Sequence, residues 1–270
     1  MERAEVDLLN TVLLGVIEGV TEFLPISSTG HLLIAEHWLG ARSDMFNVVI
    51  QAGAILAVTA IYWRKLLDLA LGWRDPANRA YLGKLILAFA ITGVLGLVAK
   101  KLGFKLPETV TPIAWALVVG GLWILLAEAI AARQGARTHV SWLTAGVVGL
   151  AQIVAGIFPG TSRSAATIFA AMLSGTGNRA AATEFSFLVG IPTMYAASLL
   201  ELHDQYKQGA AHEPWSDVAL ATVVAMVTAF VSVKWLLRYI QTHRFTAFAI
   251  YRIILGVALL GLAAAGAGPA

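Results

Sequence analysis

The sequence predicts an all-α integral membrane protein made of two similar halves, and three observations support this fold class. Hydrophobic residues make up 58% of the 270 residues and charged residues only 13%, unlike the composition of soluble domains. Six apolar stretches are long enough to cross a bilayer as helices, which takes roughly 17–25 residues each. Two further apolar stretches are each interrupted by proline, serine, threonine and glycine, and these interruptions resemble one another.

The six uninterrupted stretches are expected to be membrane-spanning helices. They run approximately over Phe46–Trp63, Tyr81–Ala99, Pro112–Arg133, Phe185–Glu201, Asp217–Leu237 and Thr246–Ala265.

The two interrupted stretches, Leu8–Gly40 and Ser141–Leu173, are predicted to be helical hairpins. Proline removes a backbone donor and ends the helix before it. The hydroxyl side chains that follow favour the start of a new helix. Each stretch is therefore expected to be re-entrant, entering the bilayer and returning to the same side.

Each half then consists of one hairpin followed by three spans. Because three is odd, the second half must start on the opposite face of the membrane, which predicts an inverted-topology repeat. We expect one membrane domain over residues 1–270, with repeat 1 at about 8–133 and repeat 2 at about 141–266. One hairpin enters from each side, and the tips of both meet near the midplane.

The repeat is visible at a constant offset between the two hairpins, since 149 − 15 = 134 and 159 − 25 = 134. The aligned pairs are Gly15 with Gly149, Glu18 with Gln152, Pro25 with Pro159 and Ser28 with Ser162. Hydroxyl-rich loops inside hydrocarbon are tolerated only where they line a cavity. The two loops are therefore expected to form the halves of one site for an anion.

Loop charges predict the orientation, because cytoplasmic loops carry an excess of lysine and arginine. One set of loops holds Arg64, Lys65, Arg74, Arg79, Arg133, Arg137, Arg179, Arg238 and Arg244. This set is expected in the cytoplasm, and both termini are then expected outside.

Glu18 and Glu22 are four residues apart, which puts both carboxylates on one face of a helix. Like charges in the membrane interior are costly, and a divalent cation between them would relieve the repulsion. Hard cations such as Mg²⁺ or Ca²⁺ prefer carboxylate oxygens and often keep a substrate phosphate as co-ligand. The alternative is that one glutamate is protonated and hydrogen-bonded to a neighbouring helix.

The first loop offers a second set of candidates. If Ser27 or Ser28 caps the next helix, its free backbone N–H groups make an anion site to which Thr29 could contribute. Ser28 and His31 are three apart, so an imidazole could act on a serine hydroxyl as base or on a leaving group as acid. The alternatives are plain capping by Ser27 and Thr29 and a packing role for His31.

The second loop places Arg163 next to a proline inside the membrane. A guanidinium group suits bidentate phosphate binding. The alternative, an ion pair with Glu18 or Glu22, is compatible with this role in the empty protein. Further donors to the same anion are expected from Gly160, Thr161, Ser162 and Ser164, with Thr167 supporting the arginine side chain.

Other polar residues carry less weight. Gln51 lies within a span, and Glu184 is expected to open one. Lys84, Lys234 and Arg252 are expected to snorkel or to pair at span ends.

The stretch from Glu18 to His31 closely resembles the first signature of the bacterial undecaprenyl-diphosphate phosphatases of the bacitracin-resistance type. The second signature of that family, Pro-Gly-x-Ser-Arg-Ser-x-x-Thr, matches Pro159 through Thr167 at every fixed position. The segments 184–188 and 247–252 are also similar to family segments, so the resemblance covers nearly the whole chain.

The resemblance implies an enzyme of the bacterial inner membrane that removes one phosphate from a C55 polyprenyl diphosphate. The product is the carrier lipid for cell-wall precursors, which explains bacitracin resistance. The resemblance further implies a divalent cation, a site facing the periplasm, a metal and diphosphate role for Glu18 and Glu22, and chemical roles for Ser28, His31 and Arg163. Either Ser28 or His31 could be the nucleophile, and we favour Ser28 with His31 as its acid/base partner.

Composition and motifs also limit other classes of function. The chain has no cysteine, which excludes disulfides and thiolate chemistry. A net charge of +3 fits positive loops at a membrane and indicates no nucleic-acid partner. A flippase for polyprenyl phosphate would use the same midplane anion site and is the alternative function. A cation channel or exchanger is weaker, because it leaves both hydroxyl loops and Arg163 unexplained. The oligomeric state stays open.

Overall fold

The computed structural model describes residues 2–104, 109–208 and 213–265, and over these ranges the chain is entirely helical, with no strand. The helices are α1 (Glu2–Thr21), α2 (Ser28–Leu39), α3 (Asp44–Ile61), α4 (Trp63–Leu71), α5 (Pro76–Lys101), α6 (Val110–Gln134), α7 (Trp142–Ile157), α8 (Arg163–Leu173), α9 (Arg179–Gln208), α10 (Trp215–Thr242) and α11 (Thr246–Ala264).

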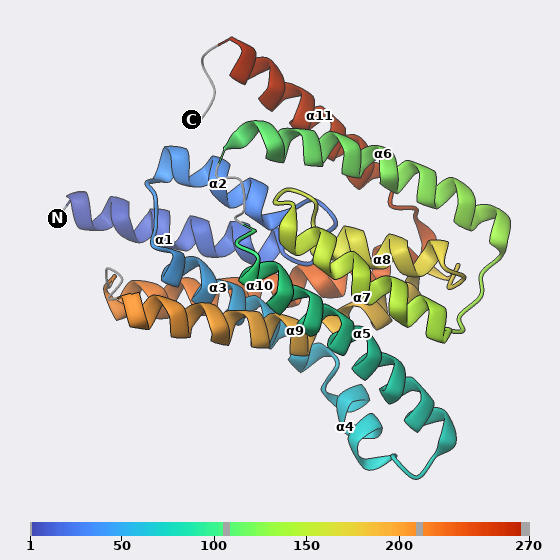
Figure 1. Ribbon diagram of the computed structural model, residues 1–270. Coiled ribbons are helices and arrows are strands. Elements are labelled where there is room, and N and C mark those ends of the chain that lie inside the picture. Colours follow the sequence, from blue (N-terminus) through green and yellow to red (C-terminus); the bar gives the residue numbers. More distant parts are fainter. Residues whose placement is uncertain (1, 105–108, 209–212, 266–270) are drawn as a thin grey trace.

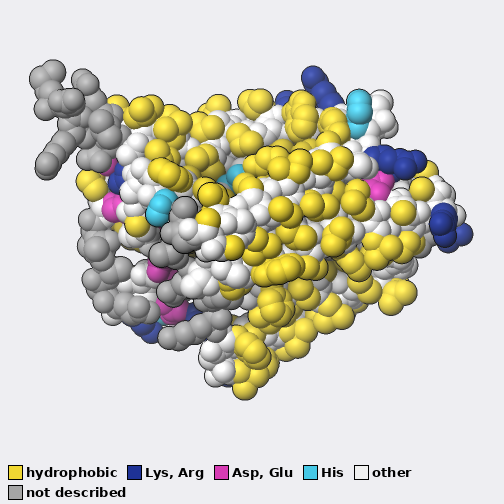
Figure 2. Space-filling model, turned by 90° about the horizontal axis from the view of Figure 1, so that it is seen from above, with side chains coloured by type: hydrophobic (Ala, Val, Ile, Leu, Met, Phe, Trp, Pro, Cys, Tyr) yellow, Lys and Arg dark blue, Asp and Glu magenta, His cyan; other side chains and the backbone are white. Residues whose placement is uncertain are grey.

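Six of these helices, α3, α5, α6, α9, α10 and α11, are long and apolar enough to cross a membrane, which confirms the six predicted spans. Figure 2 shows hydrophobic side chains over the middle of one face, with Lys and Arg side chains mainly at the right-hand end and some at the left. This distribution is the one expected for a multi-pass membrane protein, because apolar side chains face lipid and charged ones remain near water.

Two elements differ from the sequence-based expectation. The helix α9 begins at Arg179, ahead of the predicted Phe185, so Glu184 lies inside this helix and does not open it. The short helix α4 follows α3 after Tyr62 and was not predicted, because nine residues are too few to register as a span. Its Leu69 is buried while Arg64 is exposed, so α4 is a short amphipathic helix that packs on the bundle through one face.

The two interrupted stretches do form helical hairpins, α1–α2 and α7–α8. We call the residues that join them the first tip (22–27) and the second tip (158–162). Figure 1 shows the two hairpins pointing toward each other from opposite ends of the bundle, with their tips meeting in between. The hydroxyl of Ser164, just beyond the second tip, donates to the carbonyl of Leu24 in the first tip at 3.0 Å.

Each hairpin packs against a span from the other half of the chain. Helix α1 packs on α10, and α7 packs on α5. Both contacts need a glycine: a Cβ at Gly15 would lie 2.7 Å from the carbonyl oxygen of Ala221, and one at Gly149 would lie 2.8 Å from that of Ala88. The two halves are therefore interlocked around the hairpins.

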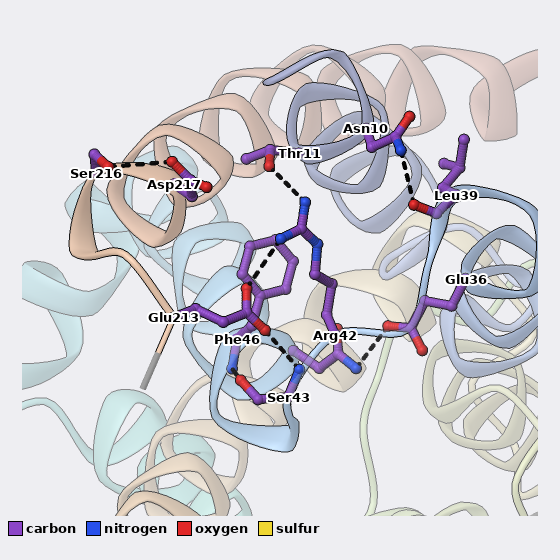
Figure 3. A network of polar contacts seen from close by, with 11 residues as sticks. Asn10, Thr11, Glu36, Leu39, Arg42, Ser43, Phe46, Glu213, Ser216 and Asp217 are labelled. Carbon is purple, nitrogen blue, oxygen red and sulfur yellow. Dashed lines mark hydrogen bonds and ion pairs between the residues drawn. The ribbon is translucent and has the colours of Figure 1, made fainter. Parts of the chain in front are cut away.

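Polar contacts fix the outer end of the first hairpin (Figure 3). Arg42 donates to Thr11 at 2.9 Å and forms an ion pair with Glu213 at 3.3 Å. The other oxygen of Glu213 accepts from the backbone N–H of Ser43 at 2.7 Å. The segment after α2 is thereby tied to α1 and to the residues that precede α10.

An ion pair between a buried carboxylate and a partly exposed arginine ties three helices at the opposite end of the bundle. Glu128 of α6 accepts from Arg179 Nε at 2.8 Å and from its Nη2 at 2.5 Å. The same carboxylate accepts from the backbone N–H of Phe245, at the start of α11, at 2.9 Å. Both oxygens of this buried carboxylate therefore accept hydrogen bonds, as a buried charge requires.

Candidate active site between the two hairpin tips

A polar cleft lies where the tips meet. It is lined by residues of both hairpins together with α3, namely Glu22, Ser27, Ser28, Thr29, Gln51, Ala155, Gly160, Ser162 and Arg163. Seven of the predicted site residues therefore gather in one place, as the convergence of the two loops requires.

The carboxylates of Glu18 and Glu22 lie one helical turn apart at the end of α1. The backbone N–H of Glu22 donates to the carbonyl of Glu18 at 2.9 Å, so the helical geometry continues one residue past Thr21. Both side chains are buried, and neither carboxylate oxygen of Glu18 has a hydrogen-bond partner in the described part of the chain. The alternative of a glutamate satisfied by a neighbouring helix therefore does not describe Glu18.

Ser28 and Glu22 are in direct contact across the first tip. The hydroxyl of Ser28 donates a hydrogen bond to Glu22 Oε2. The other oxygen, Oε1, lies 3.5 Å from the amide nitrogen of Gln51 on α3. A carboxylate that accepts from a serine hydroxyl is placed to take its proton, so this pair can act as nucleophile and base.

The serine residues that cap α2 and α8 share an unusual backbone conformation. Ser27 has φ 77° and accepts from the N–H of Gly30, and Ser162 has φ 66° and accepts from the N–H of Ala165. Positive φ values are uncommon for residues other than glycine, and strained backbone conformations of this kind cluster at functional sites. Ser27 is the cap, which settles the choice left open between Ser27 and Ser28.

The two caps also correct the alignment of the halves. Since 162 − 27 = 135, Ser162 is the counterpart of Ser27 and not of Ser28, so the offset of 134 changes by one residue within the tips, after the two prolines. Ser28 and Arg163 then occupy equivalent positions, each as the first residue of its helix. One helix start carries the candidate nucleophile, and the other carries the candidate anion-binding group.

Arg163 lines the cleft with Glu22 and Ser28. Over the described residues it forms no ion pair with Glu18 or Glu22, and its Nη1 is buried without a partner. A buried guanidinium nitrogen without an acceptor is costly. An anion in the cleft would supply that acceptor, and a phosphate has the geometry to do so.

Neither ring nitrogen of His31 is hydrogen-bonded to the hydroxyl of Ser28. Its Nδ1 lies 2.7 Å from the carbonyl oxygen of Ser27, and its Nε2 lies 2.7 Å from the hydroxyl of Tyr251 on α11. A carbonyl can only accept, so Nδ1 carries the proton and Nε2 accepts from the tyrosine when the ring is neutral. The structure therefore brings Glu22, and not His31, to the hydroxyl of Ser28. A catalytic role for His31 stays a prediction.

Three other predicted residues of the second hairpin, Thr161, Ser164 and Thr167, are not among those that line the cleft. Ser164 bonds across to the first tip, as described above. Thr167 donates to the backbone carbonyl of Arg163 at 2.8 Å, so it supports the main chain and not the arginine side chain. Thr161 presents its own carbonyl to Arg252. Gly160 is required as glycine, because its φ is 87° and a Cβ would lie 2.8 Å from the carbonyl oxygen of Ile113.

Two residues at the site were not singled out as site residues from the sequence. Gln51 lines the cleft and contacts Glu22, and its only sequence signal is a polar side chain within a span. Arg252 was expected at a span end, but it is fully buried against both tips. The expectation was wrong because the sequence does not distinguish an arginine that reaches the membrane surface from one that is bonded to acceptors inside the protein.

The fold and the cleft define a multi-pass helical membrane protein with a buried polar site suited to an anion. The family model described as "Bacitracin resistance protein BacA" matches residues 11–258. The chain belongs to this family.

Named relatives match over nearly their full lengths. An "Undecaprenyl-diphosphatase" of Rhizobium etli (strain CIAT 652) is 69% identical over 261 residues, covering 96% of this chain and 98% of the relative. Proteins with the same description from Xanthomonas oryzae pv. oryzae (strain PXO99A) and Xylella fastidiosa (strain Temecula1 / ATCC 700964) are each 58% identical, covering 97% and 94% of this chain.

Proposed function

We propose that this chain is an undecaprenyl-diphosphatase, which hydrolyses undecaprenyl diphosphate to undecaprenyl phosphate and inorganic phosphate. The observation that carries the proposal is the contact between Ser28 and Glu22 in the same cleft as Arg163. These groups supply a nucleophile, a base and a phosphate-binding cation. The family membership and the names of the relatives support the same activity.

In the first step, Ser28 Oγ attacks the terminal phosphorus and its proton passes to Glu22 Oε2. The bond from that phosphorus to the bridging oxygen breaks, and undecaprenyl phosphate leaves. A phosphate leaving group is a stable anion near neutral pH, so this step needs no strong acid. Glu22 then passes its proton to the departing lipid phosphate.

In the second step, water attacks the phosphoserine and gives a proton to Glu22. The bond from phosphorus to Ser28 Oγ breaks, Ser28 regains the proton, and inorganic phosphate leaves. Arg163 and the N-termini of α2 and α8 stabilise the charge on the transferring phosphoryl group in both steps.

The donor set at the end of α1 fits a divalent cation. The two oxygens of Glu18 are buried without a partner, and such oxygens are ligands that Mg²⁺ or Ca²⁺ prefers. The described residues contain no group of three or more acidic or histidine side chains that could hold a metal ion by themselves, so phosphate oxygens would complete the coordination. Glu18 and Glu22 would hold the ion, and when bound it would neutralise charge on the diphosphate.

The arrangement of the halves supports an inverted repeat with two re-entrant hairpins. The hairpins point toward each other from opposite ends, and each packs on a span of the other half. In our proposal the arginine-rich loops face the cytoplasm, both termini lie outside the bacterial inner membrane, and the cleft serves the periplasmic side. The apolar tail of the substrate stays in lipid while the head group reaches the tips.

A lipid flippase is the second candidate function. Opposed broken helices that share a central anion site are also the layout of alternating-access transporters. A flippase would move undecaprenyl phosphate between leaflets of a vesicle without releasing phosphate.

The test is phosphate release by the purified chain in detergent with undecaprenyl diphosphate and Mg²⁺ or Ca²⁺. We expect inorganic phosphate in stoichiometric amounts with the lipid monophosphate, and we expect EDTA to stop the release. Folded protein that releases no phosphate under any of these metal conditions would contradict the proposal and favour the flippase.

A further inference from the structure

Arg252 of α11 is fully buried and lies against both hairpin tips. Its guanidinium carries five N–H donors, and the structure provides five carbonyl acceptors. These are the carbonyls of Pro25 (3.3 Å), Thr161 (3.1 Å), Gly160 (2.9 Å), Ala116 (3.0 Å) and Leu117 (3.4 Å).

The acceptors divide between the tips and α6. One carbonyl comes from the first tip, two come from the second tip, and two come from α6. Within the described residues Arg252 forms no ion pair with a carboxylate, so its charge is balanced only by carbonyl dipoles. Lysine has three donors on a point charge and could not make the same five contacts.

Helix α6 is shaped to seat this side chain. A Cβ at Gly120 would lie 2.1 Å from Nη2 of Arg252, so only glycine leaves the guanidinium its place. The seat and the five acceptors together define one position for the group, and the two tips are held relative to that position.

The contact with the second tip also orients a peptide group. In a planar trans peptide the carbonyl and the following N–H point in opposite directions. Because the carbonyl of Thr161 points to Arg252, the N–H of Ser162 points away from it, and Ser162 lines the cleft. A peptide dipole aligned by a buried cation presents its positive end on the far side, where it favours an anion.

We propose that Arg252 is a positioning residue for the phosphoryl-transfer site. It holds the two tips in one relative geometry and turns the peptide between Thr161 and Ser162 so that its N–H faces the diphosphate. It does not touch the reacting atoms. This inference rests on the proposed phosphatase activity for its kinetic test, but its geometric part does not.

The kinetic test compares Arg252→Leu, Arg252→Lys, Gly120→Ala and the double variant R252L/G120A. We expect kcat to fall about 100-fold in Arg252→Leu, since misplacing groups by about 1 Å costs that much. Arg252→Lys should recover part of the loss, and KM should change less than kcat in each variant. Gly120→Ala should lower kcat through displacement of the guanidinium, so the double variant should be no slower than Arg252→Leu. Gly93→Ala, which adds a Cβ in open space, is the matched control.

A second measurement reads the tips directly and needs no activity. The chain has no cysteine, so spin labels at Thr29→Cys, in the first turn of α2, and at Phe158→Cys, in the second tip, report one distance between the two hairpins without background. We expect a narrow distance distribution with Arg252 and a broader one with Arg252→Leu or Gly120→Ala.

Several results would overturn the proposal. One is folded Arg252→Leu with kcat within two-fold of wild type. A second is a double variant R252L/G120A whose loss in kcat equals the product of the losses in the two single variants. A third is a distance distribution in Arg252→Leu and Gly120→Ala that is as narrow as in the wild type. Loss of folded protein in Arg252→Leu, Arg252→Lys and Gly120→Ala alike would assign Arg252 to stability alone. If the wild-type chain releases no phosphate, the phosphatase proposal fails, and the distance measurement still decides the role of Arg252.

Discussion

The hydroxyl of Ser28 donates a hydrogen bond to the carboxylate of Glu22 across the first hairpin tip. The two residues are six apart in sequence, and the turn between them brings them together because α1 ends at Thr21 and α2 starts at Ser28. This contact places a base at a nucleophile without the help of the nearby histidine. It also gives Glu22 a role that a metal-binding carboxylate alone would not require.

Replacing Glu22 by glutamine should lower kcat by about 10²–10⁴, because an amide accepts the hydrogen bond but cannot take the proton. Phosphate release by folded Glu22→Gln protein measures the effect. Glu184→Gln is the matched control, since Glu184 pairs with Lys65 away from the cleft and should leave the rate unchanged. A Glu22→Gln rate near that of wild type would remove Glu22 as the base.

Ser28 should become phosphorylated during turnover. When the reaction with labelled substrate is quenched in acid, we expect label on Ser28 in the wild-type protein, because phosphoserine survives acid while phosphohistidine does not. Ser28→Ala has no hydroxyl at this position and should carry no label. Label that is lost in acid and stable in base would instead identify His31 as the nucleophile.

Ser27 should matter mainly for folding of the tip. Ser27→Ala removes the cap of α2, and we expect a loss of about 1 kcal/mol in the free energy of unfolding. Thermal unfolding in detergent measures this, with Ser216→Ala as an exposed serine control. A loss of activity as complete as in Ser28→Ala, at unchanged thermal stability, would give Ser27 a chemical role instead.

Arg163 should govern binding and rate together. Charge-assisted hydrogen bonds are worth about 1.5–3 kcal/mol, so Arg163→Ala should lower kcat/KM by roughly 10–100-fold or more. Arg163→Lys should recover little, because a point charge does not replace a bidentate fork. Exposed Arg238→Ala is the control, and equal kcat/KM values in Arg163→Ala and this control would exclude Arg163 from the site.

The ion pair between Glu128 and Arg179 should affect stability and not chemistry. Glu128→Gln leaves the arginine without its charge partner. Because the Arg179 side chain is 26% exposed and keeps access to water, we expect a loss of about 1.5–3 kcal/mol in the free energy of unfolding, the range for hydrogen bonds to charged groups. We expect a lower thermal midpoint with an unchanged kcat for the folded fraction, and partial recovery of the midpoint in the double variant E128Q/R179Q. A normal midpoint in Glu128→Gln would show that the pair does not contribute to folding.

Hydropathy predicts the six spans because a helix in lipid must be long and apolar, and this requirement is local in sequence. The helix breaks at the tips are equally local, since Pro25 and Pro159 are each followed by residues that start helices. The short helix α4 and the early start of α9 escape such reasoning because packing on neighbouring helices, and not hydropathy, determines them.

Only the part of the site made of polar and charged residue types within apolar sequence could be predicted. The carboxylates, Ser28 and Arg163 stand out because polar and charged groups are costly in hydrocarbon and are found there mainly at functional sites. The pairing of His31 with Tyr251 joins residues 220 positions apart, so no spacing rule indicates it. The five carbonyls around Arg252 are likewise invisible in a sequence, since every residue has a carbonyl.

The most direct test of a single site shared by both tips is phosphate release from undecaprenyl diphosphate by Glu22→Gln, Arg163→Ala and the double variant E22Q/R163A. Groups that act on one transition state give strongly non-additive losses. We therefore predict that each single variant loses most of the rate and that the double variant loses far less than the product of the two losses. Single variants near the wild-type rate, or losses that multiply, would contradict a shared site.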